Sequence, residues 1–466
     1  MVPLLLQSKT PKRRISCWEG ESGFIAIGGR PKPAKPFLRL LANSISFSFE
    51  TFSIDVHCNR LLCLLVEDRG VGNPLLTLLD LPDQERVDRG LEHTPREIWQ
   101  QPDTWGTTFR ICSARKAELD EALRRAGIGR GSASPTIYLV GAGTSDYTGR
   151  ALAPLVRRRW GCDAWPVPST TLLTDFDEFH SAGKEYLWIS FSRSGDSPEG
   201  VAVLKRALEH NGSIQHLVIT CNQKGKMAEL CARHPDRALA LVLDDAVNDR
   251  GLAMTSSFSN MLVAGQCAAH LDDLEEFGAV VSGLSACGRQ FLAVAAETSA
   301  EVTSLGCARA CFVGSGVLRG VADECALKVV ELSAGKITTL AETPLGLRHG
   351  PMSSVDGQTL FVAFLSSDPR RRGYELDLLR EIDRKRLGRV RLVVTAGGGA
   401  DVAELADYVL PLNCPMDLPD CYRPVLDVML GQLLGLFASL RCGLKPDQPS
   451  PTGAITRVVQ PIKLYS

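Results

Sequence analysis

The chain reads Ile137-Tyr138-Leu139-Val140-Gly141-Ala142-Gly143-Thr144-Ser145, and the centre of this stretch recurs 173 positions later as Val313-Gly314-Ser315-Gly316. Each copy follows a short apolar run and precedes a helical pattern, as expected where a buried parallel strand ends. Two further apolar segments repeat in the same order: residues 188–191 with 361–364, 173 positions apart, and residues 217–220 with 392–395, 175 positions apart. Short apolar runs rarely match three times at a nearly constant offset. We therefore predict two copies of one α/β domain.

Strand and helix patterns alternate from His93 onward, which predicts parallel sheets flanked by helices. We predict a first domain at residues 93–285, a second at 286–445 and a tail at 446–466. Residues 1–92 show no sustained helical or strand period. We expect them to form an extension of unassigned fold, which could be disordered.

Composition limits the partners of the chain. Among 466 residues, 44% are apolar, and 52 Lys and Arg balance 53 Asp and Glu. No overall attraction to nucleic acid or to an anionic membrane follows from this balance. The longest apolar stretch, Val425 to Leu440, contains Asp427 and Gln432 and is predicted to be a buried helix rather than a membrane span. The apolar run at residues 2–6 is too short for a secretion signal, so we expect a cytoplasmic protein.

The 15 cysteines form neither a Cys-x-x-Cys pair nor a Cys/His cluster with metal-ligand spacing. This distribution is typical of a reducing compartment and argues against structural zinc. We expect the cysteines to be small core residues, and we predict no metal site.

The turn around Gly143, Thr144 and Ser145 combines glycines, which let a ligand approach the backbone, with hydroxyl donors at a helix N-terminus. It differs from a dinucleotide fingerprint because Asp146 replaces the third glycine and would face a pyrophosphate. The pattern suits a phosphate site. A tight strand-to-helix turn with capping residues explains this turn equally well.

A second hydroxyl-rich turn follows the apolar run at residues 186–191 and contains Ser192, Arg193, Ser194 and Ser197. Parallel strands present their carboxyl ends to one crevice, so two such turns could enclose one phosphate. Capping of the next helix, with Pro198 in its first turn, is compatible with this role.

Together the two turns resemble the sugar isomerase (SIS) domain, whose Ser/Thr loops hold the phosphate of a phosphosugar. The resemblance is closer to the AgaS family of galactosamine-6-phosphate deaminase/isomerases, also described as tagatose-6-phosphate ketose/aldose isomerases. The segments that carry it, between about Thr94 and Val459, are residues 219–222 (Ile-Thr-Cys-Asn), 249–257, 324–336, 347–351 (Leu-Arg-His-Gly-Pro) and 453–459. The isomerase half of glucosamine-6-phosphate synthase is similar at a greater distance. The resemblance implies two tandem SIS domains, each a flavodoxin-like, Rossmann-like three-layer α/β/α sandwich.

Moving a carbonyl between the first two sugar carbons requires a base beside the carbonyl and a group that opens the ring. Glu324, Lys328 and Glu331 form one polar stripe on an otherwise apolar helix. From spacing alone, a salt-bridged solvent face is the better explanation of this stripe. The family resemblance implies instead that Glu331 is the catalytic base, and Lys328 could then stabilise the enediolate charge. Lys336 is a weaker candidate for the same task.

His349 lies in a loop bounded by two glycines and a proline, and its side chain can shuttle a proton near neutral pH. A loop histidine is more often an ordinary surface residue. In similar enzymes this histidine can reach the active site of a neighbouring subunit, so the resemblance implies a homodimer or a larger assembly. Sugar-binding roles are predicted for Thr255, Ser256, Ser257, Arg348 and Arg457. Thr255 to Ser257 could also be a helix cap, and Thr456 before the arginine departs from the family pattern.

The expected reaction converts D-galactosamine 6-phosphate to D-tagatose 6-phosphate and ammonia, with no metal or organic cofactor. Plain aldose/ketose isomerisation uses the same proton transfer and stays open. A non-catalytic phosphosugar sensor is disfavoured by the presence of Glu331 and His349 together. A nucleotide-dependent oxidoreductase is disfavoured by Asp146.

Overall fold

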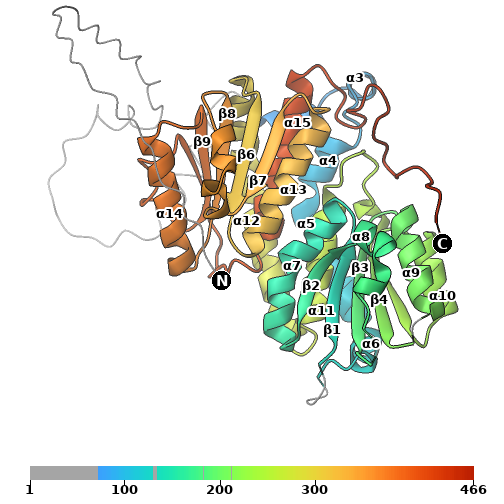
Figure 1. The fold of residues 1–466 in the computed structure, drawn as a ribbon. Coiled ribbons are helices and arrows are strands. Elements are labelled where there is room, and N and C mark those ends of the chain that lie inside the picture. The colour runs from blue at the N-terminus through green and yellow to red at the C-terminus, as the bar shows by residue number, and fades with distance from the viewer. Residues whose placement is uncertain (1–71, 130–133, 182, 211, 466) are drawn as a thin grey trace, which may run out of the picture. The chain divides into compact units, whose positions relative to one another are not determined.

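The computed structural model describes residues 72–129, 134–181, 183–210 and 212–465 (Figure 1). Two parallel five-stranded sheets carry helices on both faces. The first sheet has the order β2-β1-β3-β4-β5, and the second, counted from β7, has the order β7-β6-β8-β9-β10. Both follow the flavodoxin-like order 2-1-3-4-5, which confirms the predicted α/β fold.

The strand positions confirm the internal repeat. β1 begins at Thr136 and β6 at Arg309, and β3 and β8 begin at Tyr186 and Thr359, so both pairs are 173 positions apart. The first sheet consists of β1 (Thr136–Gly141), β2 (Ala164–Pro168), β3 (Tyr186–Ser192), β4 (Ile214–Thr220) and β5 (Ala238–Val242). The second consists of β6 (Arg309–Gly314), β7 (Thr338–Glu342), β8 (Thr359–Leu365), β9 (Val390–Ala396) and β10 (Tyr408–Leu412).

The helices repeat in the same way. Around the first sheet lie α5 (Gln101–Ala114), α6 (Lys116–Arg125), α7 (Thr144–Trp160), α8 (Ser169–Thr174), α9 (Pro198–His210), α10 (Lys226–Arg233) and α11 (Ser256–Ala269). Around the second lie α12 (Leu274–Ser304), α13 (Val317–Leu332), α14 (Pro369–Arg384) and α15 (Pro424–Arg441). Both α7 and α13 begin directly after a Gly-x-Gly turn whose second glycine has positive φ, 55° at Gly143 and 60° at Gly316.

One hydrophobic core joins the two domains. It includes Leu139 and Ile189 from the first sheet and Phe312 and Val362 from the second. Helix α13 packs on α7 and on α15 in this core. At its crossing with α7, a Cβ atom on Gly320 would lie 2.7 Å from the backbone nitrogen of Ala151. The absent side chain therefore lets α13 lie close to the first domain.

Two predicted boundaries need correction. The predicted extension at residues 1–92 lies outside the described residues up to 71, but from 72 onward it is folded: α2 (Pro74–Leu79) and α3 (Asp83–Arg89) precede α4 (Thr94–Trp99). Leu75 and Leu91 are fully buried in the shared core. These helices are too short to show a clear hydrophobic period. The predicted boundary between residues 285 and 286 falls inside α12, a continuous helix of 31 residues.

The apolar helix predicted at residues 425–440 is confirmed as α15. By length and composition α12 and α15 could each cross a membrane, but 83% of the apolar window of α15 and 50% of that of α12 are buried inside the protein. Core helices of soluble proteins meet the same criterion.

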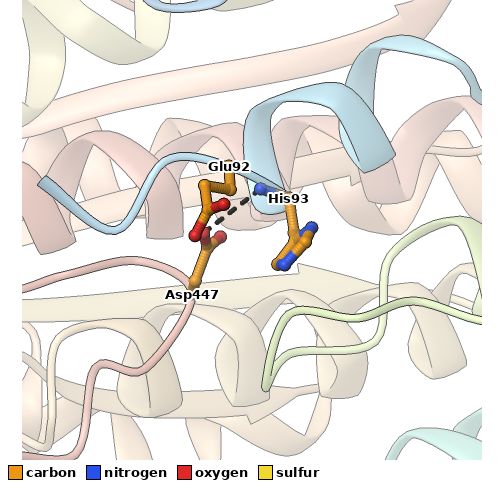
Figure 2. A group of neighbouring side chains, drawn as sticks. All are labelled: Glu92, His93 and Asp447. Atoms are coloured by element: carbon orange, nitrogen blue, oxygen red, sulfur yellow. Dashed lines mark hydrogen bonds between the residues drawn. The ribbon is translucent and has the colours of Figure 1, made fainter. Parts of the chain in front are cut away.

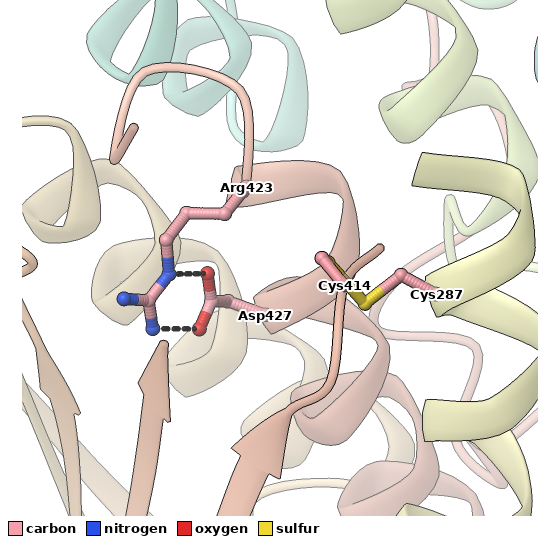
Figure 3. Close-up of a disulfide and its surroundings, with 4 residues drawn as sticks. All are labelled: Cys287, Cys414, Arg423 and Asp427. Atoms are coloured by element: carbon pink, nitrogen blue, oxygen red, sulfur yellow. Dashed lines mark hydrogen bonds and ion pairs between the residues drawn. A yellow bond between two sulfur atoms is a disulfide. The ribbon is translucent and has the colours of Figure 1, made fainter. Parts of the chain in front are cut away.

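The cysteines depart from expectation at one point. Nine described thiols are buried and free, as predicted for small core residues. Cys287 on α12 and Cys414, between β10 and α15, instead form a disulfide across a sequence separation of 127 (Figure 3). Since their spacing in the sequence gives no sign of proximity, this pair could not be predicted. The disulfide fastens the segment before α15 to the helix that connects the two domains.

Candidate active site

A cavity of about 580 Å³ opens at the carboxyl ends of the strands of the first sheet. Its walls include the turn after β1, the turn after β3, helix α13 and the C-terminal tail. The side chains that carry its chemistry are Thr144, Ser145, Ser192, Ser194, Ser197, Lys328 and Glu331. The structure thus brings together both predicted phosphate turns and two of the three predicted catalytic residues.

The turn after β1 is held close to its own helix by glycines. A Cβ atom on Gly141 would lie 2.3 Å from the carbonyl carbon of Ser145, so no other residue fits there. Asp146 forms an ion pair with Arg150 at 2.8 Å, and Arg150 also contacts Asp323 of α13 at 3.0 Å. Asp146, which argued against a nucleotide site, is therefore paired with Arg150, the residue that joins α7 to α13.

The turn after β3 is fixed by internal hydrogen bonds. Gly195, at φ 67°, donates its N–H to Ser192 Oγ at 3.1 Å, and Asp196 N donates to Ser194 Oγ at 3.2 Å. Asn222 Nδ2 donates to the carbonyl of Ser194 at 2.8 Å. Backbone and hydroxyl groups are thereby held in place beside the cavity.

Arg193 of this turn makes contacts that were not predicted. Its side chain is buried, and its guanidinium donates to the carbonyls of Gly251 at 3.3 Å, of Leu252 at 3.1 Å and of Arg457. Burial and the nearby Arg457 lower its pKa. The guanidinium is thus engaged with three carbonyl groups, but its Nε has no hydrogen-bond partner and Arg193 lines the cavity, so its predicted phosphate contact stays a prediction.

The polar stripe of α13 is not a solvent face. Glu324 and Lys328 are fully buried, and Glu331 is about a quarter exposed at the cavity wall. Lys328 Nζ lies 2.6 Å from Glu331 Oε2, 3.4 Å from Glu324 Oε1 and 3.0 Å from Thr144 Oγ1. Sequence spacing favoured the salt-bridged solvent face because it cannot show that the first domain covers this side of α13.

Burial changes the pKa values of Glu324 and Lys328. Burial raises the pKa of Glu324 to about 8, against the attraction of Lys328. Burial lowers the pKa of Lys328, but Glu324 and Glu331 outweigh it, and the net shift is upward. A lysine held protonated next to Glu331 can stabilise negative charge that develops on a substrate oxygen.

The tail closes one side of the cavity, where residues 453–462 line it. Arg457 donates from Nε to the carbonyl of Asp249 at 2.7 Å and from Nη2 to Asn248 Oδ1 at 2.8 Å. Arg457 is therefore at the site, but it binds the first domain. In this position it orders the tail.

Asp447 fastens the start of the tail to the beginning of α4. Its carboxylate accepts hydrogen bonds from His93 N at 3.1 Å, Thr94 N at 2.8 Å and Thr94 Oγ1 at 2.7 Å. Figure 2 shows that the carboxylate of Glu92 and the ring of His93 lie beside it, and potential ligand atoms of these three residues lie within 4.8 Å of one another. The sequence separates them by more than 350 positions, so the group was not predicted.

Other predicted sugar-binding residues lie away from the cavity. Thr255 and Ser257 donate side-chain and backbone hydrogen bonds to the buried carboxylate of Asp249, and Ser256 N does the same. Asp249 thus caps the N-terminus of α11 and the Thr255 side chain does not, while sugar binding by these three residues stays a prediction. Arg348 pairs with Glu381 at 2.7 Å.

His349 is exposed at the end of a short 3₁₀ turn (Gly346–Arg348) and is not among the residues that line the cavity of its own chain. Lys336 donates to the carbonyl of Cys442.

Sequence reasoning also missed residues at the site. Ser169 and Thr170, directly after β2, line the cavity. Their signal was available, since hydroxyl residues that follow a neighbouring parallel strand belong to the same crevice.

Comparison with known proteins agrees with this architecture. The family model described as SIS domain matches residues 132–271. A Streptomyces coelicolor protein with an AgaS name is 38% identical over 82% of this chain and 97% of its own length. The D-galactosamine-6-phosphate deaminase AgaS of Escherichia coli O157:H7 is 34% identical over 80% of this chain and 95% of its own. The crystal structure of tagatose-6-phosphate ketose/aldose isomerase from Escherichia coli superposes with a TM-score of 0.71 at 32% identity, covering 78% of this chain and 95% of that one.

Proposed function

The chain belongs to the AgaS family, and on that premise we propose that it is a phosphosugar isomerase-deaminase that converts D-galactosamine 6-phosphate to D-tagatose 6-phosphate and ammonia. The main support is one geometric observation: Glu331 lines the same cavity as the two hydroxyl-rich turns, although it comes from the other copy of the domain. A phosphosugar bound by its phosphate could therefore present its carbonyl end to an acid-base group.

In this proposal the phosphate binds at the turns after β1 and β3. Ser145, Ser192, Ser194 and Ser197 offer hydroxyl groups, and backbone N–H groups at the start of α7 add donors. Thr144 has a further task, because its hydroxyl also contacts Glu324 and Lys328. It links phosphate binding to the catalytic stripe.

Glu331 then removes the proton from C2 of the open-chain sugar and returns it to C1. The electron pair of the broken C–H bond passes through an enediol-type intermediate, whose oxygen Lys328 stabilises. With an amine at C2 the product is an imine, and water hydrolyses it to the ketose and ammonia. With a hydroxyl at C2 the same proton transfer is an aldose/ketose isomerisation. None of these steps requires a cofactor, and we propose a cytoplasmic enzyme.

Ring opening requires a proton donor and acceptor, and we assign this task to His349 of a neighbouring subunit. His349 is exposed and does not line the cavity of its own chain, which suits a residue that acts across a subunit contact. The proposal therefore includes a homodimer or a larger homo-oligomer.

Two experiments test these points. Purified protein is incubated with galactosamine 6-phosphate and, separately, with tagatose 6-phosphate, and ammonia and sugar products are measured. Ammonia from the amino sugar supports the deaminase, and sugar interconversion without ammonia supports the plain isomerase. If neither sugar is turned over, the alternative of a non-catalytic phosphosugar sensor would be favoured.

The second experiment mixes two inactive variants, Glu331→Gln and His349→Ala, after partial unfolding and refolding. Mixed oligomers contain sites with an intact Glu331 from one chain and an intact His349 from the other, so activity should return. If the mixture stays as inactive as its components, His349 does not act across subunits.

A further inference from the structure

The duplication gives the second domain its own copy of the phosphate crevice, at the carboxyl ends of β6 and β8. The turn after β6 has the same length as the turn after β1, and Gly316 takes the same backbone conformation as Gly143. The turn after β8 is shorter: three residues, 366–368, separate β8 from α14, where five, 193–197, separate β3 from α9. The backbone of an anion site is therefore present twice.

The first turn of this second crevice lacks the two hydroxyl groups that stand at the start of α7 in the first domain. Val317 and Leu318 stand where the first domain has Thr144 and Ser145. Both side chains are buried in the shared core. The turn after β6 keeps one hydroxyl, that of Ser315, which is hydrogen-bonded to Glu375. The turn after β8 offers two more hydroxyl donors, Ser366 and Ser367.

An internal carboxylate binds these donors. Asp420, which is 7% exposed, accepts hydrogen bonds from Ser366 Oγ, from Ser367 N at 2.8 Å and from Ser367 Oγ at 2.9 Å. Arg371 Nη1 lies 3.7 Å and Arg423 Nη1 3.8 Å from its oxygens. Two hydroxyls, a backbone N–H and two guanidinium groups form the kind of surroundings that a phosphate monoester requires.

A further donor of the turn, Ser366 N, binds a second internal carboxylate, Glu375 Oε2, at 2.8 Å. Arg423 is fully buried and is held by Asp427 at 2.7 Å (Figure 3). The position of the Arg423 guanidinium is thus fixed by Asp427 in the core, and does not depend on Asp420 alone.

The catalytic positions are also replaced. At an offset of 173, the counterparts of Lys328 and Glu331 on α7 are Leu155 and Arg158. Leu155 is fully buried, and Arg158 lies 2.7 Å from the sulfur of Cys421, next to Asp420. The second crevice has no carboxylate at the position of the proposed base and has a further cation beside its anion.

We propose that Asp420 occupies the duplicated anion site of the second domain in place of a phosphate group. Each chain then binds one phosphate monoester, in the first domain, and removal of the Asp420 carboxylate opens a second site for an anion of this class. The prediction that the wild type binds one phosphate per chain rests on the proposed function of the first crevice. The prediction that removal of the Asp420 carboxylate adds one phosphate site does not.

The test counts inorganic phosphate bound per folded chain by equilibrium dialysis, in the wild type and in Asp420→Ala. The wild type should bind one phosphate and Asp420→Ala two. The matched control is Asp417→Ala, an exposed aspartate in the same segment, which should bind one. Asp420→Asn keeps the volume and an acceptor oxygen and should also bind one.

A folded Asp420→Ala protein that binds no more phosphate than the wild type overturns the proposal. So does a wild type that binds two phosphates and loses one on Ser366→Ala. If the alanine variant does not fold, Asp420→Ser is measured by the same criterion. A wild type that binds none, with Asp420→Ala binding one, contradicts the proposed function of the first crevice and leaves this inference intact.

Discussion

Lys328 Nζ lies 3.0 Å from Thr144 Oγ1, and this hydrogen bond joins residues 184 positions apart, one from each copy of the repeat. Thr144 belongs to the helix N-terminus that borders the phosphate turn, and Lys328 is bonded to the proposed base. In the proposed mechanism, phosphate binding and proton transfer are therefore connected through a single hydroxyl group. The predictions below examine this connection and the elements that hold it in place.

Glu331→Gln should lower kcat by about 10²- to 10⁴-fold, because the amide cannot accept the C2 proton. Binding of inorganic phosphate should stay within about twofold of the wild type, since the hydroxyl turns are untouched. Steady-state kinetics and dialysis measure the two effects. Glu229→Gln, on the exposed face of α10, is the matched control and should leave both unchanged. Full turnover in Glu331→Gln would remove the proposed mechanism.

Gly320→Ala should destabilise the protein by about 1–3 kcal/mol and lower kcat, because the added methyl group meets the backbone of Ala151 and pushes α13 away from α7. Denaturant unfolding measures the stability. Gly373→Ala in α14 is the control, since nothing lies within 4 Å of its added Cβ and alanine favours the helix. Equal effects of both substitutions would show that the helix crossing is not tightly constrained.

Glu324 should make stability fall as pH rises. Burial raises its pKa from 4.5 to about 8, so the folded state holds this proton more tightly than the unfolded state does. Its stabilisation is complete below pH 4.5 and is lost as pH rises through about 8. Glu324→Gln stays neutral, and its free energy of unfolding should decrease less over this range than that of the wild type. Parallel pH profiles for the two proteins would contradict the assignment.

Arg457→Met should raise KM by about tenfold with a smaller change in kcat, because two hydrogen bonds that hold the tail against the first domain are lost. Lys463→Met, in the exposed part of the tail, should leave KM unchanged. If Arg457 instead stabilised the transition state, kcat would fall strongly. The ratio of the two effects therefore separates positioning from catalysis.

Cys287→Ser should lower the free energy of unfolding by about 2–4 kcal/mol, since the disulfide closes a long loop in the unfolded chain. A reducing agent should lower the melting temperature of the wild type and have no effect on the variant. Cys442→Ser, at a free and partly exposed thiol, is the control. If the reducing agent does not change the wild type, the two cysteines are not bonded in solution.

The sequence was sufficient for the fold and for the phosphate turns because both depend on local patterns. Gly141 and Gly143 indicate the end of a strand without any knowledge of the tertiary structure. The repeat at 173 positions then predicts the second sheet from the first. The orientation of side chains across the domain contact could not be predicted in this way. Arg193 has the composition of an anion ligand, yet its guanidinium binds backbone carbonyls from two other segments.

The role of Asp249 was missed for the same reason. Its carboxylate binds the Thr255 to Ser257 segment, and a single turn of sequence does not reveal which way three adjacent hydroxyl groups point. Contacts between residues far apart in the sequence, such as Cys287 with Cys414 at a separation of 127 positions, can be identified only in the folded chain. The sequence pattern predicts elements, and packing decides which of their faces meet.

In the proposed mechanism the two copies of the domain have different tasks: one binds the phosphate of the ligand, and the other carries the groups that act on the sugar. Ser145 and Ser194 lie on one copy, and Lys328 and Glu331 lie on the other. Replacing either copy by a duplicate of the other should therefore abolish turnover. The two domains share the arrangement of their strands, but the side chains at the equivalent site positions differ. Duplication of one domain has thus produced an asymmetric enzyme, in which each domain supplies proposed functions that the other lacks.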